Sequence, residues 1–152
     1  MKSIMTLISM AILLNVTFTS EAIAQQGMSW HGSGGWGHGS QYGMMYDPQT
    51  IESISGDVVS VDKVTLMHGM HYGVHLTVKT AEGNVSVHLG PAWYIENQDV
   101  KITPNDKVTI KGSRITFDGQ PAMIAIEVRK GNEVLTLRDP EGYPVWSGWK
   151  RQ

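Results

Sequence analysis

Between Leu66 and Leu76 the sequence reads LMHGMHYGVHL, a run in which thioether and imidazole side chains recur over eleven residues. Copper(I) is a soft ion, and thioether and imidazole ligands can hold it without any cysteine. The run therefore predicts either a soft-metal site or a loop that is simply rich in these residues. The candidate metal ligands are His68, Met70, His71, His75 and His88, with Met67 as a spare.

Two of these histidines are predicted to lie near each other across a β-hairpin. Apolar residues alternate on both sides of the turn signal at residues 81–84. With Glu82-Gly83 as the turn, His75 and His88 become diagonal neighbours on the face away from the core, about 7–8 Å apart between α-carbons. Two imidazoles at this distance can share an ion. In the alternative interpretation both are solvent-facing strand residues and Met70 is an apolar filler at the barrel end.

The elements that would position these residues are mostly strands. The expected order is a strand over 51–64, a hairpin over 72–89, a short helix over 92–98, a strand over 107–111, a hairpin over 115–128 and a last strand over 133–137. This order predicts an all-β fold, a small OB-fold-like Greek-key barrel with one short helix between its third and fourth strands. An open β-sandwich, which would lack the helix, is the alternative.

The ends of the chain have their own composition. Residues 1–24 combine an early lysine, an apolar run and a small-x-small ending, which predicts an export signal. Residues 25–47 are rich in Gly, His, Trp and Met and are expected to form a flexible tail. The barrel is expected over 48–138, followed by a C-terminal tail over 139–152. An exported small protein fits the bacterial periplasm.

Composition excludes several classes of function. The chain has no cysteine, so thiolate metal sites, disulfides and c-type haem attachment are excluded. Its formal net charge of −2 offers no basic field for nucleic acid, although OB-folds often bind it. The sequence has no phosphate-binding loop, nucleophile elbow or His-Glu metalloprotease motif, so we expect no enzyme.

Three tryptophans are candidates for binding a partner: Trp93, Trp146 and Trp149. Exposed aromatic residues beside arginine are enriched at protein interfaces, and Arg151 follows the last two. Trp93 could also help to seal the barrel. The C-terminal pair could equally fold back over the barrel.

Several motifs carry a resemblance to known families. GDVVSV at 56–61, VSVHLGPAWYI at 85–95 and DKVTIKGSRITFDGQPAMIAIEV at 106–128 resemble the small exported bacterial OB-fold (BOF-type) proteins. The barrel and the ending from Leu137-Arg138-Asp139 to Trp146 look like the domain of the magnetosome proteins MamS and MamX, without the haem motifs of MamX. The Met, His and Trp content is similar to that of the copper(I)-binding barrels of copper efflux systems, with a different arrangement. These resemblances imply an OB barrel with a periplasmic binding role.

The resulting hypothesis is a non-enzymatic periplasmic OB-fold protein that binds a small ligand or a partner protein. Copper(I), bound by the Met/His cluster, is its most concrete ligand. The alternative is an envelope interaction or assembly module of the MamS/MamX type.

Overall fold

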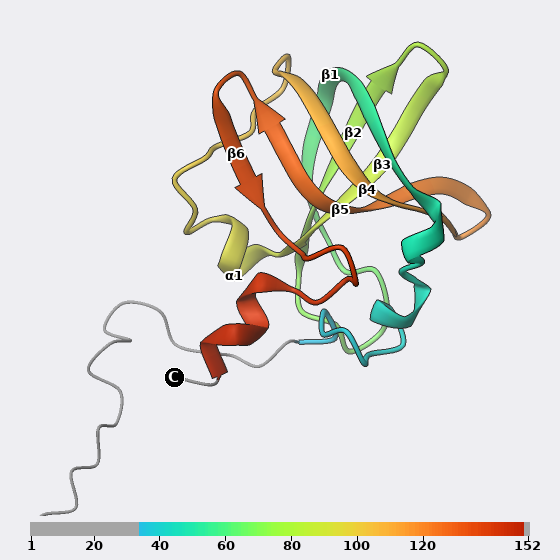
Figure 1. Ribbon diagram of the computed structural model, residues 1–152, viewed down its shortest axis with the longest axis vertical. Helices are drawn as coiled ribbons and strands as arrows, with labels where there is room; N and C mark the ends of the chain where they lie inside the picture. Colours follow the sequence, from blue (N-terminus) through green and yellow to red (C-terminus); the bar gives the residue numbers. More distant parts are fainter. Residues whose placement is uncertain (1–33, 151–152) are drawn as a thin grey trace, which may run out of the picture.

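The first strand, β1 (Ile51–Val64), bends so that it pairs with two neighbours. Its first half is antiparallel to β4 (Lys107–Phe117), and its second half is antiparallel to β2 (Gly73–Thr80). The register with β2 shifts between Val58 and Ser60, next to the point where β1 changes partners. The computed structural model, which describes residues 34–150, thus confirms the long strand predicted over 51–64 (Figure 1).

The ring closes through β3 (Gly83–Pro91) and β5 (Gln120–Lys130). These two strands are parallel and pair only over Ser86–His88 and Ala122–Ile124. The strand order around the ring is β1-β2-β3-β5-β4, which is that of an OB-fold, and β6 (Glu133–Thr136) adds to β5. The helix α1 (Ala92–Ile95) lies between β3 and β4, as predicted, but spans only four residues. The expected OB-fold-like barrel is confirmed.

The core fills the inside of this ring. Most apolar side chains of the strands point inward, although Val59 and Val61 of β1 are exposed. Several have no exposed surface: Leu76, Val87, Ile110, Met123, Ala125 and Val128. The gap predicted between two strands at residues 112–114 is absent, because β4 runs through it with a register shift at Lys111 and Gly112. A β-carbon at Gly112 would collide with the backbone carbonyl of Ile124, so glycine permits this close approach of β4 and β5.

Residues 34–50, which we call the strap, pack against the barrel. The strap contains the short 3₁₀ helices η2 (Gly43–Met45) and η3 (Pro48–Thr50). The sequence predicts a flexible tail up to residue 47, but the described part of that tail buries Trp36 and Tyr42 to 1% and 2% exposure. Large aromatic side chains bury much more surface than the surrounding glycines and serines, and this burial offsets the cost of ordering the segment. The rest of the predicted tail and the predicted signal lie outside the described residues.

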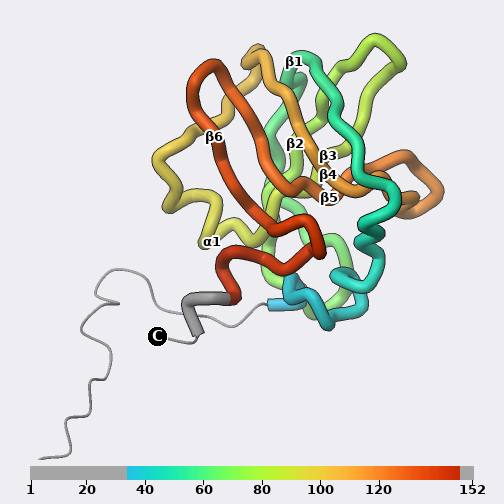
Figure 2. The backbone as a smooth tube through the Cα atoms, viewed as in Figure 1, coloured from blue at the N-terminus to red at the C-terminus, as the bar shows by residue number. Residues whose placement is uncertain are grey.

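The C-terminal segment also packs against the barrel. It runs from β6 through an isolated bridge between Arg138 and Pro144 to the 3₁₀ helix η4 (Val145–Lys150). Leu137 and Trp146 have no exposed surface. In the tube view of Figure 2, this segment, the strap and the β1–β2 loop lie together at one end of the barrel. The contacts of Tyr46 with Pro140 and of Trp36 with Gly73 agree with this arrangement.

Candidate functional site

His75 and His88 form a stacked pair across the β2–β3 hairpin. Their ring centroids are 4.1 Å apart and their planes differ by 5°. The sequence predicts a diagonal pair with Glu82-Gly83 as the turn, but the turn lies one residue earlier, which shifts each cross-strand partner by two residues. Thr80 faces Gly83, so the two turn residues precede Gly83, and His75 comes directly opposite His88. Gly83 has a φ of +118°, which suits glycine.

The burial of His88 has a clear structural cause. The sequence predicts this residue on the face of β3 away from the core, and in the alternative interpretation it faces solvent, yet it is only 1% exposed. Phe117 meets its ring edge to face at 5.3 Å, and Tyr42 from the strap covers it at 5.8 Å. Both faces of β3 are therefore buried at this position, one by the core and the other by the strap and β4.

Tyr42 also holds His88 by a hydrogen bond. The Tyr42 Oη and the His88 Nδ1 lie 2.9 Å apart, in a fully buried contact. Either the hydroxyl donates to Nδ1, or Nδ1–H donates to the hydroxyl oxygen, depending on the imidazole tautomer. The strap is fixed nearby by Trp36, whose Nε1–H donates to the carbonyl of His71 at 3.0 Å. The strap thus selects the orientation of the His88 ring.

Burial keeps both imidazoles uncharged. Burial lowers the pKa of His75 to about 4, an effect that the carboxylate of Asp62 partly opposes. Burial also lowers the pKa of His88 to about 3, and the charges of His75 and Arg138 add to this effect. Burial raises the pKa of Tyr42, so its hydroxyl keeps its proton. At neutral pH the cluster is a set of neutral donors and acceptors, and neutral imidazole is the form that binds metals.

Arg138 supports the closure of the barrel behind this pair. Its Nη1 donates to the carbonyl of Leu89 at 3.0 Å and to that of Ala125 at 2.6 Å, which joins β3 to β5. Its guanidinium lies over the ring of Trp146, 5.0 Å from the centroid. The side chain is 3% exposed, and burial lowers its pKa. A buried positive charge close to His88 further disfavours the protonated imidazole.

A pocket of about 360 Å³ opens beside the histidine pair. Its walls include both histidines, Ser86, Phe117 and Gln120. The Nε2 atom of His75 is buried and has no hydrogen-bond partner within the described residues. An unpaired buried nitrogen is costly, so such an atom next to a pocket marks a place where a ligand can bind.

The other predicted metal ligands lie elsewhere. Met70 contacts Gly35 and His71 contacts Gly34, so both pack against the strap. His68 is an exposed loop residue. Over residues 34–150, no three His, Asp or Glu side chains are grouped closely enough to hold a metal ion. Within these residues His68 and His71 are not grouped with the hairpin pair, and the strap, predicted to be part of a flexible tail, packs against His71.

The predicted partner-binding tryptophans differ in their surroundings. Trp146 is completely buried between Arg138 and Tyr94, whose ring lies 5.3 Å away, so it folds back over the barrel. Trp93 is partly buried and packs against the core. The side chain of Trp149 lies outside the part of the chain that the structure describes. Of the two interpretations that the sequence left open for Trp146, burial is the one observed.

A second pocket, of about 350 Å³, lies between the loop after α1 and the strands β1, β2 and β3. Apolar side chains such as Val74, Leu76 and Leu89 form most of its walls, and the ion pair of Lys63 with Glu96 lies at its rim. Binding sites usually combine apolar walls with a few convergent polar groups. The histidine pocket combines its apolar walls with a buried imidazole nitrogen that has no hydrogen-bond partner, so it is the stronger candidate.

Fold and site together define a small closed OB-like barrel with a buried imidazole pair held by an N-terminal strap. A comparison with protein families identifies the family of this chain, which the fold alone does not. The model of the MamS/MamX magnetosome protein family matches residues 50–135, more than half of the chain, and the chain belongs to this family. A search of the curated proteins gives no match. The looser of the two barrel resemblances is thus confirmed, and the BOF-type resemblance stays a prediction.

Sequence reasoning missed Tyr42 and Arg138. Tyr42 stands among glycines and methionines, and only its aromatic character distinguishes it from a flexible spacer. Arg138 follows the strand predicted over 133–137, and a fully buried arginine is rare. The sequence carries no local signal for either contact, because both depend on segments that are distant in the chain.

Proposed function

We propose that this protein is a non-enzymatic interaction module of the cell envelope, of the MamS/MamX type. The observation that carries this proposal is the family match, which covers the whole length of the barrel strands β1 to β5. The family is described as one of magnetosome proteins, which supports a role in a magnetosome-associated assembly. Fold alone would not support it, because OB-like barrels serve many functions.

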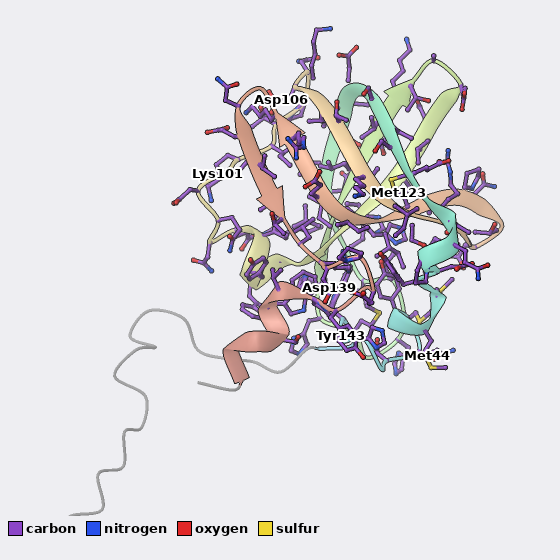
Figure 3. All side chains as sticks on the ribbon, in the orientation of Figure 1. Met44, Lys101, Asp106, Met123, Asp139 and Tyr143 are labelled. Carbon is purple, nitrogen blue, oxygen red and sulfur yellow. The ribbon has the colours of Figure 1, made fainter. Side chains whose placement is uncertain are left out.

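The surface best suited to a partner lies at the end of the barrel that the strap covers. There the ring of His38 stacks on Tyr143, with centroids 3.9 Å apart, and Tyr143 is still 52% exposed. Met44 is 76% exposed. Figure 3 shows Met44 and Tyr143 at this same end. Aromatic and methionine side chains are enriched in protein interfaces, so we call His38, Met44 and Tyr143 the end surface.

We also propose that the protein acts outside the cytoplasm, after removal of residues 1–24. The support is the pattern of residues 1–24, in which an early lysine and an apolar run are followed by a small-x-small ending. Over the described residues, no helix is long and apolar enough to span a membrane. Cell fractionation with sequencing of the mature amino end tests this proposal, and Gln25 as the first residue is the expected result.

Photo-crosslinking in the source organism tests the interaction module. A photoreactive amino acid replaces Met44 or Tyr143, and the matched control carries it at Val134, which is 41% exposed. Val134 belongs to the β5–β6 hairpin, whose turn points to the opposite end of the barrel (Figure 1). We expect one envelope protein to be captured from the two end-surface positions and not from Val134. Equal capture from all three positions, or none, contradicts the proposal.

A further inference from the structure

The stacked histidines cannot share a metal ion in the arrangement observed. An imidazole nitrogen binds a metal through a lone pair that lies in the plane of the ring. The rings of His75 and His88 are parallel and 4.1 Å apart, so their lone pairs point along separate planes. One ring has to turn before a single ion can contact both.

His75 is the ring that can turn. It is only partly buried, and its Nε2 makes no hydrogen bond that would be lost. Its turning gives up only the ring stacking with His88. His88, in contrast, is held by Tyr42 and enclosed by Phe117. The pair thus consists of one fixed and one movable imidazole.

We infer that His75 and His88 form a two-imidazole site for a soft monovalent cation, copper(I) or its analogue silver(I), reached through the pocket beside them. Two nitrogen donors satisfy a d¹⁰ monovalent cation, which accepts a linear pair of ligands. Zinc, in contrast, requires about four ligands. Since no third His, Asp or Glu joins the pair in the described residues, a two-coordinate cation fits this donor set best.

Tyr42 gives His88 the partner that a metal-binding histidine normally has. A ligating imidazole usually donates its second N–H to a nearby oxygen, which fixes the tautomer and the ring orientation. When Nδ1–H of His88 donates to the Tyr42 oxygen, the lone pair of Nε2 is free for the metal. Tyr42 is therefore a positioning residue of this site. The inference does not depend on the proposed interaction module, because it uses none of the end-surface residues.

A copper(I) competition titration of the purified protein against a chromophoric chelator tests the site, with His75→Phe as the key variant. Phenylalanine keeps an aromatic ring opposite His88 and removes the nitrogen ligands. We expect about one equivalent of copper(I) in the wild type and an affinity at least about 100-fold lower in His75→Phe, more than the 10- to 100-fold that loss of an outer-shell partner typically costs. The matched control is the double variant His68→Ala/His71→Ala, which removes exposed loop histidines and is expected to bind as the wild type does.

Silver(I) titration followed by nitrogen NMR provides a readout that folding defects do not mimic. We expect one ring nitrogen in each of His75 and His88 to show splitting by the silver nucleus, and the other histidines to be unaffected. The inference is overturned if the wild type takes no copper(I) from the chelator, if His75→Phe binds with wild-type affinity, or if the silver signals appear on other histidines.

Discussion

Tyr42 and His88 are 46 residues apart in sequence, and the 2.9 Å contact between the Tyr42 Oη and the His88 Nδ1 joins the strap to strand β3. Both side chains are almost completely buried, at 2% and 1% exposure. A bond in this environment fixes two things together: the position of the strap and the orientation of one imidazole.

The first prediction concerns the hydroxyl of Tyr42. Tyr42→Phe keeps the ring and leaves His88 Nδ1 buried without its partner, which costs about 1–3 kcal/mol of unfolding free energy. Urea denaturation measures the loss. The matched control is Tyr72→Phe, because Tyr72 is 67% exposed, and there a change within about 0.5 kcal/mol is expected. Equal stability of the two variants would show that the buried bond contributes nothing.

The second prediction tests whether the strap is docked in solution. Trp36 lies directly over the backbone of Gly73, where a β-carbon would collide with its indole ring. Gly73→Ala should displace Trp36 and cost about 1–3 kcal/mol, as overpacking typically does. It should also speed proteolytic cleavage within residues 34–46. Gly39→Ala is the control, since nothing lies within 4 Å of its β-carbon position. A Gly73→Ala protein as protease-resistant as this control would rule out docking of the strap.

The barrel could be predicted from sequence, and the strap could not. Alternation of apolar and polar residues identified the β2–β3 hairpin, in which Leu76 and Val78 are buried and Thr77 between them is less so. In β1 the strand is present as predicted, but Val59 and Val61 are exposed. His75 and His88 lie close together as predicted, but directly opposite rather than diagonal, because the turn comes one residue earlier than expected. The burial of His88 is not predicted because it depends on Tyr42. Tyr42 belongs to the strap, which has too few apolar residues to be predicted as ordered. Tyr42 and Phe117 cover His88 from distant parts of the chain, and such contacts leave no periodic pattern in the sequence.

The third prediction is a loss of stability at mildly acidic pH. In the folded protein the pKa values of His75 and His88 are lowered to about 4 and about 3, against 6.5 in the unfolded chain. Below pH 6.5 the unfolded chain therefore binds more protons than the folded protein, and stability falls as the pH falls. The groups facing the pair are Asp62, which opposes the lowering for His75, and Tyr42 and Arg138, which adjoin His88.

Unfolding free energies at about pH 7.5 and pH 5 measure this effect. Asp106, whose pKa is also lowered, contributes below this window because its unfolded value is 3.8. His75→Phe removes one of the two titrating groups and should show a shallower dependence on pH than the wild type. A wild-type stability that is constant over this range would mean that the histidines are accessible to protons in the folded state.

The last prediction concerns Arg138 and the closure of the ring. Strands β3 and β5 pair over only a few residues, and Arg138 Nη1 adds bonds to both of them through the carbonyls of Leu89 and Ala125. Lysine cannot reproduce the planar fork of arginine or its stacking on Trp146. Arg138→Lys should therefore lower the unfolding free energy by about 2 kcal/mol, within the range of about 1.5–3 kcal/mol for a hydrogen bond that involves a charged group. Arg129→Lys, at an exposed ion pair with Glu127, should change it by less than about 1 kcal/mol. If the β3 and β5 amides exchange hydrogen faster in Arg138→Lys but not in Arg129→Lys, the lost stability comes from the contact between these two strands. If these amides exchange at the same rate in both variants, Arg138 does not hold the two strands together.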